Sequence, residues 1–168
     1  MHRGAEAATV HIDAPVVDRV VVQEVTDGAH DIFLRGAELP GLSVQRVGPA
    51  AFAGQGKTLS SEWGLALHIE SRKGGETRNY LLDFGFTPTV YLNNLDLLKI
   101  DTAAVDALIL SHGHFDHLGG MIGFLGRGAR ECARICASTP AARTIFATVS
   151  AATPTAASAT LASWTAIG

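Results

Sequence analysis

The sequence has 168 residues, of which 47% are hydrophobic and 17% are charged, and its formal net charge is −3 at pH 7. This length and composition indicate one folded domain rather than a disordered chain. The slightly acidic balance offers no basic surface for nucleic acid or for a membrane, so we expect neither as a partner.

Membrane spans and export signals are not evident along the chain. No apolar segment approaches the length that crosses a bilayer. The N-terminal stretch MHRGAEAATVHIDAP lacks the apolar core of a signal peptide, so we expect a cytoplasmic protein. The cysteines, Cys132 and Cys136, are too few and too close in sequence to indicate a disulfide scaffold, and we interpret them as small buried thiols.

A strand is the first predicted element. Residues 16–26 are rich in β-branched side chains and stop at the turn pair Asp27-Gly28. Residues 29–61 are rich in Gly and Pro without a clear period, which predicts a long connection with short pieces of structure. Within it, AFAGQGKT (51–58) ends like a phosphate-binding P-loop. Because Ala51 stands where that pattern needs Gly and no convincing strand precedes it, a flexible loop is favoured.

A hairpin and a helix are predicted next. The runs WGLALHIES (63–71) and TRNYLLDFG (77–85) alternate partly in polarity and flank a Gly-Gly turn, which predicts a hairpin. His68 is then a strand residue with a hydrogen-bonded neighbour. Thr87-Pro88 resembles an N-cap followed by proline in the first turn, and an apolar stripe continues from there to about Ile100.

A short strand and a second helix complete the predicted elements. Asp101 can cap a short turn that leads into the buried strand DALILSH (106–112). HLGGMIGFLG (117–126) is apolar enough for a helix, although its glycines weaken the helical tendency. The order of strand, hairpin, helix, strand, polar loop and helix predicts an α+β domain, with a mixed sheet and helices on one face.

The C-terminal segment differs in composition from the rest. From Ala129 to Gly168 there are 13 Ala, 7 Thr and 4 Ser, and no charged residue follows Arg143. Neither a strand period nor a helical period persists there, so we predict an irregular, low-complexity tail over residues 128–168 with few contacts to the sheet. Such a composition is also typical of a GC-rich gene translated out of frame.

Four residues of metal-ligand type lie within the stretch LILSHGHFDHLGG (108–120), namely His112, His114, Asp116 and His117. Imidazole nitrogen and carboxylate oxygen are ligands that zinc prefers. Where a strand runs into a loop, His112 and His114 can point the same way, because alternate residues share a face. Asp116 and His117 lie beyond the turn and can face a second, neighbouring metal position, and two adjacent metals can clamp a substrate.

Surface histidines bonded to nearby backbone are the alternative interpretation of this stretch. That interpretation suits a single histidine, and we apply it to the isolated His2, His11 and His30. It does not account for three histidines and an aspartate at this spacing, so we favour a metal site.

SHGHFDH resembles the H-x-H-x-D-H motif of the metallo-β-lactamase superfamily, and YLLDFG resembles the strand-ending aspartate motif upstream of it. The wider pattern of GLALHIE, LLDFG, NNLDLLKID and VDALILSHGHFDHLGGM is similar to one branch of that superfamily. This branch includes the dihydropterin-ribofuranosylaminobenzene phosphate synthases and related metal-dependent hydrolases. The resemblance spans residues 16–127, which we take as a partial domain.

The resemblance implies a partial αββα sandwich, its N-terminal half, with a dinuclear zinc site at one edge and a small-molecule substrate. His112 and His114 would bind the first metal, and Asp116 and His117 the second. Asp116 would also act in catalysis by orienting the attacking hydroxide. Asp83 would support the loop by hydrogen bonds rather than bind metal directly.

The superfamily pattern continues with a further histidine, a bridging aspartate and a last histidine. The printed sequence has no His after His117 and no Asp after Asp116. We therefore expect weak zinc binding and consider three hypotheses. The chain is a truncated zinc hydrolase with little or no activity alone, a non-catalytic metal-binding or interaction fragment, or a frameshift product. A dihydropterin-type transferase is the alternative activity of an intact parent.

Overall fold

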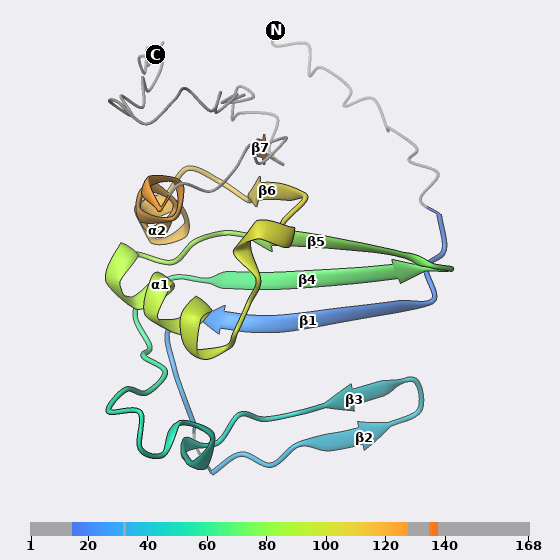
Figure 1. Cartoon of the computed structure of the whole chain (residues 1–168), viewed down its shortest axis with the longest axis horizontal. Coiled ribbons are helices and arrows are strands. Elements are labelled where there is room, and N and C mark those ends of the chain that lie inside the picture. Colours follow the sequence, from blue (N-terminus) through green and yellow to red (C-terminus); the bar gives the residue numbers. More distant parts are fainter. Residues whose placement is uncertain (1–14, 32, 128–134, 138–168) are drawn as a thin grey trace, which may run out of the picture.

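A mixed sheet of five strands organises the fold (Figure 1). The structure is a computed structural model and describes residues 15–31, 33–127 and 135–137. The strands, in their order across the sheet, are β1 (Arg19–Thr26), β4 (Ala66–Lys73), β5 (Glu76–Leu82), β6 (Ala107–Leu110) and β7 (Ile135–Ala137). The β1–β4 and β4–β5 pairs are antiparallel, whereas β5–β6 and β6–β7 are parallel. With helices α1 (Pro88–Leu97) and α2 (Phe115–Gly126), this confirms the predicted α+β class.

Local sequence signals account for most element boundaries. The predicted strand, hairpin, helix and buried strand correspond to β1, β4–β5, α1 and β6. Helix α1 begins as expected, because the Thr87 hydroxyl accepts a hydrogen bond from the Val90 amide and proline occupies the first turn. Asp101 caps the 3₁₀ turn η2 (Thr102–Ala104) by accepting a hydrogen bond from the Ala103 amide. None of the described helices is long and apolar enough to cross a bilayer.

The core lies between one face of the sheet and the two helices. Alternate residues of a strand point to opposite faces, so one set of strand side chains meets the helices. That set includes Leu81, Leu108 and Leu110, whose predicted burial is confirmed. Tyr91 of α1 and Phe124 of α2 pack against them and are almost completely buried.

The opposite face of the sheet is also apolar. Cross-strand register aligns two rows on it, Val22-Ile69-Tyr80-Ala107 and Glu24-Leu67-Leu82-Ile109, which are apolar except at Glu24. Val22 and Glu24 of the edge strand β1 are exposed, and the other members of these rows are only partly buried. The described residues therefore form one sheet covered by helices on one face, and a second sheet of a sandwich is not among them.

The long connection between β1 and β4 contains short structured pieces, as predicted. Strands β2 (Ala37–Leu39) and β3 (Leu42–Val44) form a separate antiparallel hairpin, which is not part of the main sheet (Figure 1). A 3₁₀ turn, η1 (Pro49–Phe52), and further turns follow. The P-loop-like stretch 51–58 thus follows directly on a 3₁₀ turn rather than a strand, and the next element after it is β4 rather than a helix, which confirms the loop interpretation.

Strand β7 contradicts part of the prediction for the tail. Residues 135–137 pair in parallel with β6, so the expectation of an irregular segment with few contacts to the sheet was wrong there. Three residues are too few for a period-two pattern to appear, and parallel strands often form continuous apolar runs that do not alternate. The predictions for Cys132, His2, His11 and the rest of the tail fall on residues outside those described.

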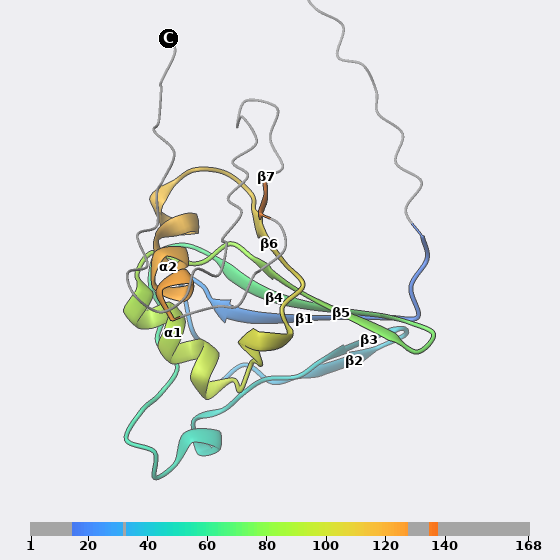
Figure 2. The same ribbon diagram turned by 45° about the horizontal axis from the view of Figure 1, so that its top comes forward.

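Helix α2 lies unusually close to the end of β5. A Cβ atom on Gly119 would come within 1.9 Å of the Phe86 carbonyl oxygen, and one on Gly120 within 2.0 Å of the Phe84 carbonyl oxygen. The glycines that weaken the helix in isolation are therefore what allows it to approach this backbone. Figures 1 and 2 show the result, with α1 and α2 side by side at the end of the sheet where β5 and β6 terminate.

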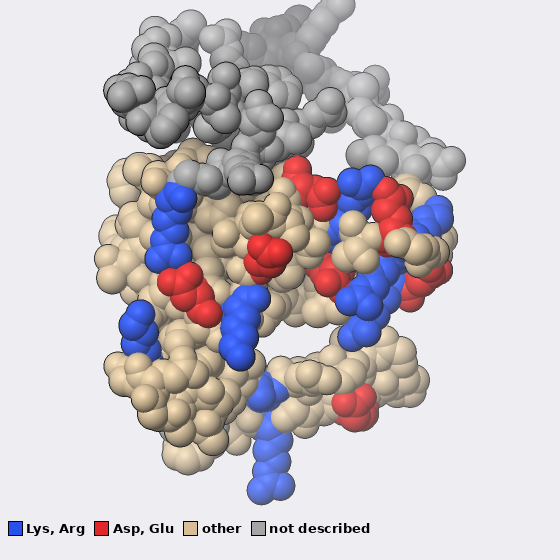
Figure 3. Space-filling view, in the orientation of Figure 1, with Lys and Arg blue, Asp and Glu red and all other residues tan. Residues whose placement is uncertain are grey.

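Charged side chains are of both signs on the face shown in Figure 3. Many of them gather at the end of the sheet that carries the β4–β5 turn, including the ion pairs Arg72–Glu70 and Arg78–Asp106. This is the end of the sheet opposite to the helices, so the carboxyl ends of β5 and β6 lie away from this group of charges.

Candidate metal centre

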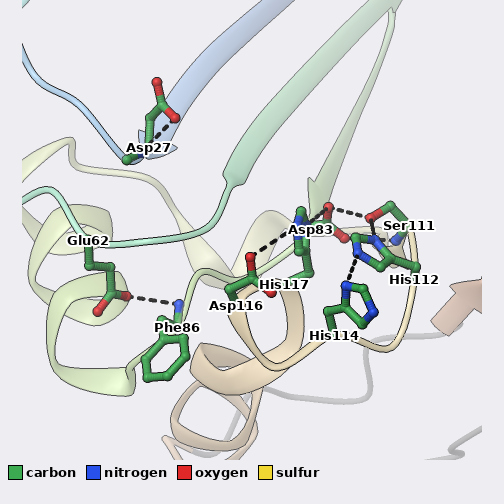
Figure 4. Close-up of polar contacts among 10 residues, drawn as sticks. Asp27, Glu62, Asp83, Phe86, Ser111, His112, His114, Asp116 and His117 are labelled. Carbon is green, nitrogen blue, oxygen red and sulfur yellow. Dashed lines mark hydrogen bonds and ion pairs between the residues drawn. The ribbon is translucent and has the colours of Figure 1, made fainter.

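The H-x-H-x-D-H motif spans the junction of β6 and α2 (Figure 4). His112 lies in the connecting loop, and His114 is the N-cap residue of α2. Asp116 and His117 lie in the first helical turn, so the helix begins two residues earlier than the sequence predicts. The predicted start was late because the His114 side chain makes no capping hydrogen bond and no standard N-cap residue marks this position.

Asp83 joins this motif from the neighbouring strand. It follows β5 directly, and the carboxyl ends of the parallel strands β5 and β6 meet at one edge of the sheet. Its side chain is 1% exposed, and its backbone has φ 57°, a left-handed conformation that aspartate tolerates better than most residues. Oδ1 accepts a hydrogen bond from the Ser111 amide at 2.7 Å, and Oδ2 accepts from the Ser111 hydroxyl at 2.6 Å and from His117 Nδ1 at 2.7 Å. Asp83 therefore ties together the two ends of the motif.

These hydrogen bonds determine which ring nitrogens face the candidate site. Because His117 Nδ1 donates to Asp83, its Nε2 retains the lone pair that a metal requires. The Ser111 hydroxyl donates to Asp83 and so accepts from His112 Nδ1, at 2.9 Å. His112 Nε2 is then also left with its lone pair. One buried carboxylate thus orients two histidines, one directly and one through Ser111.

The possible ligand atoms form two adjacent pairs. His112 Nε2 and His114 Nδ1 are 3.1 Å apart, and His117 Nε2 and Asp116 Oδ2 are 3.6 Å apart. The His112 ring contacts both other imidazoles, with its centroid 4.5 Å from that of His114 and 4.1 Å from that of His117 and the planes inclined by 71° and 52°. Two ligands at about 2.0–2.1 Å from one tetrahedral zinc lie about 3.3–3.4 Å from each other. Each pair therefore has the chemistry and the spacing of two ligands of a single ion.

A complete ligand set is absent from the described part of the chain. Across residues 15–31, 33–127 and 135–137, no group of three or more His, Cys, Asp or Glu side chains could hold a metal ion. His68 does not contribute, because it lies in β4 and its Nε2 contacts Asn79 Oδ1 at 3.2 Å, as the sequence predicted. The residues present fit two half-sites, by which we mean two pairs of ligands that would each contact one metal ion: His112 with His114, and Asp116 with His117.

Sequence reasoning missed two residues that position this centre. Ser111 lies directly before the motif. A hydroxyl between the end of a strand and His112 could have indicated a hydrogen-bonding partner for that histidine. Glu62 carried no signal. Its carboxylate accepts hydrogen bonds from the Phe86 and Thr87 amides at 3.0 and 2.8 Å and from the Thr87 hydroxyl at 2.7 Å, which fixes the turn between Asp83 and α1.

Gly64 fixes the position of Asp116 from the other side. It has φ 115°, and a Cβ atom there would lie 1.9 Å from the Asp116 carbonyl oxygen. The segment before β4 therefore passes directly against the first turn of α2. The site is held by backbone contacts from two directions.

Comparison with known proteins gives a family match over this part of the chain. Residues 69–129 match the metallo-beta-lactamase superfamily. The matched segment runs from β4 through α2, so it contains Asp83 and all four residues of the H-x-H-x-D-H motif. The metallo-β-lactamase match thus covers the whole candidate centre.

A curated relative gives a second similarity. The chain is 36% identical over 74 residues to the 7,8-dihydropterin-6-methyl-4-(β-D-ribofuranosyl)-aminobenzene-5′-phosphate synthase of Methanocaldococcus jannaschii. The aligned part is 44% of this chain and 25% of that protein. The chain therefore spans about a quarter of the length of this relative.

Proposed function

We propose that this chain carries the N-terminal half of a zinc-dependent hydrolytic centre of the metallo-β-lactamase fold. The observation that supports the proposal is the pair of half-sites, in which His112 and His114 would hold one zinc ion and Asp116 and His117 a second. A small molecule with an ester or phosphate bond is the proposed substrate. Because each half-site has two protein ligands and a zinc site normally has three or four, we propose weak metal binding and little turnover by the chain alone.

The chemistry divides between the metal and the side chains. Bound zinc would lower the pKa of a water molecule to about 7, which makes hydroxide available at neutral pH. Asp116, next to the second half-site, would accept a hydrogen bond from the attacking water and so orient it. Asp83 and Ser111 would keep the histidine rings in place throughout.

The sheet face opposite the helices supports a sandwich for the complete fold. Its rows of apolar residues, including Ile69 and Leu82, are arranged like those of a sheet that packs against another sheet. We propose that the described sheet and helices are two of the four layers of an αββα sandwich. The aligned part is only 25% of the relative, which leaves room for further layers in that protein.

Zinc titration tests the metal part of the proposal. We expect purified protein to bind zinc substoichiometrically and to lose it readily to a chelator. Two tightly held zinc ions per chain would contradict the half-site interpretation, because additional ligands would then be required. Complete failure to bind zinc would contradict the metal centre itself.

An activity screen tests the catalytic part. Generic phosphodiester, phosphomonoester, carboxylic ester and lactam substrates are incubated with the protein and added zinc or manganese. We expect little or no turnover. Robust turnover that Asp116→Ala abolishes would show a complete active site and would refute the proposal that the chain is inactive alone.

The named relative favours a second candidate activity. Its name describes a synthase rather than a hydrolase. An intact parent protein with this N-terminal half could therefore transfer a group to a substrate instead of to water. Zinc binding does not distinguish the two activities, whereas a product analysis with an added acceptor does.

A further inference from the structure

Three aromatic side chains remain exposed around the candidate centre. Trp63, Phe86 and Phe115 are 81%, 43% and 63% exposed, and we call them the aromatic rim. Phe115 stands between His114 and Asp116 in the chain. The Phe86 and Phe115 rings are in contact, with centroids 5.9 Å apart and planes inclined by 56°.

The rim is adjacent to the site because of specific backbone contacts. The Phe84 amide donates to the His117 carbonyl at 2.8 Å, two residues before Phe86. Gly119, in the second turn of α2, lies against the Phe86 carbonyl. Trp63 lies between Glu62, which accepts from the Phe86 amide, and Gly64, which lies against Asp116. All three aromatic residues are therefore attached to backbone that also positions the metal ligands.

Core packing among the described residues does not account for these three rings. The aromatic residues of the main core cluster are Phe84, Tyr91 and Phe124, and each is at most 1% exposed. Exposed aromatic rings on rigid backbone, beside a group of polar residues, are typical of a ligand-binding surface. The rim has an uncharged, planar character, whereas the centre beside it consists of imidazole and carboxylate groups.

We propose that the aromatic rim binds a planar aromatic or heteroaromatic ring of the substrate, while its ester or phosphate group is at the metal centre. This inference rests on the proposed function for the position of the reacting group. Phe86 and Phe115 are then specificity residues, since they contact the ring and not the bond that reacts. Substrates with a saturated ring of equal size are bound less well.

Paired probes test this inference in the full-length protein. The first pair is 1-naphthyl phosphate and decahydronaphthyl phosphate, which share the anionic group and differ in the flatness of the ring. The variants are Phe86→Leu and Phe115→Leu, which keep an apolar side chain but remove the aromatic ring. Phe33→Leu is the matched control, because Phe33 is 86% exposed and lies in the connection between β1 and β2.

The expected result is a loss restricted to the planar probe. Each rim variant should bind 1-naphthyl phosphate about two- to tenfold more weakly in calorimetric titration, the range that one aromatic contact provides. Binding of decahydronaphthyl phosphate, binding by Phe33→Leu and the circular dichroism spectra should not change. Equal losses for both probes, or no loss in either variant, would overturn the proposal.

An uncharged probe separates this inference from the proposed function. Binding of 2-naphthol, measured by ligand-observed NMR without zinc, should be weaker in both rim variants even if the protein binds no metal. If zinc binds normally but 2-naphthol binding is the same in all variants, the rim inference fails and the metal centre stands. If the rim variants reduce self-association in sedimentation and leave both aromatic probes unaffected, the rim is a protein contact and the inference is likewise wrong.

Discussion

Asp83 and His117 are 34 positions apart in the chain, and a hydrogen bond of 2.7 Å joins Asp83 Oδ2 to His117 Nδ1. The same oxygen accepts the Ser111 hydroxyl, which in turn contacts His112. Removal of the negative charge at this single position should therefore disturb two candidate metal ligands, His112 and His117.

We expect Asp83→Asn to weaken zinc binding about 10- to 100-fold, the usual effect of losing a partner that orients metal ligands. Asparagine has one amide nitrogen in place of a carboxylate oxygen. If this nitrogen takes the position of Asp83 Oδ2, it cannot accept the hydrogen bonds that the Ser111 hydroxyl and His117 Nδ1 now donate. Zinc affinity is measured by competition with a chelator of known affinity. Asp27→Asn is the control, because Asp27 bonds only its neighbour Gly28 in the described structure. Equal zinc affinity in Asp83→Asn and the parent protein would refute the orienting role.

His114→Ala should remove the zinc that the protein retains after dialysis. The substitution leaves His112 Nε2 without the nitrogen that faces it at 3.1 Å, so the first half-site would keep a single ligand. Metal content is measured by elemental analysis. His68→Ala, a histidine of β4 outside the site, should retain the parent's zinc content. A similar loss in both variants would indicate nonspecific binding by histidines.

Gly64→Ala should destabilise the protein more than Gly74→Ala. Both glycines have positive φ, 115° and 58°, but a Cβ at Gly64 would meet the Asp116 backbone, whereas one at Gly74 would have nothing within 4 Å. The overlap should reduce the free energy of unfolding by about 1–3 kcal/mol beyond any loss at Gly74. Chemical denaturation measures the difference. Equal losses would show that backbone conformation alone, and not the contact with Asp116, determines the requirement for glycine.

Acid stability should depend on Asp106. The Asn79 amide, and then the Arg78 guanidinium, hold the pKa of the Asp106 carboxyl below its usual value. A carboxyl whose pKa is lowered by folding stabilises the protein above the pKa of the unfolded chain, about 3.9, and this contribution is lost as the pH falls through the lower folded value. Asp106→Asn should therefore be less stable than the parent at pH 7, with the difference shrinking below about pH 4.

Denaturant midpoints measured across this pH range check the expectation. Glu24→Gln serves as the control, because Glu24 is exposed and makes no hydrogen bond or ion pair that the described residues record. A difference between Asp106→Asn and the parent that stays constant with pH would contradict the assignment.

The sequence predicts elements well where a local pattern specifies them. The Thr87-Pro88 start of α1 and the Gly-Gly turn between β4 and β5 are local signals, and both are confirmed. The stretch around His112 likewise names the candidate ligands. By contrast, the contact of Gly64 with Asp116 joins residues more than fifty positions apart, and no periodicity encodes it. The short strand β7 was missed for the same reason, since pairing with β6 and not its own pattern makes it a strand.

The connectivity of the sheet has a kinetic consequence. The β4–β5 hairpin closes over a two-residue turn, whereas β6 reaches β5 only after the chain has passed through α1. Closing a short loop costs less chain entropy than closing a long one, so the hairpin that ends at Asp83 should form early and the loop with His112 should join it late. Zinc would then bind residues whose contacts with each other form only after the folding transition state. Bound zinc should therefore slow unfolding while leaving the folding rate nearly unchanged. The metal would stabilise the domain kinetically after it has folded.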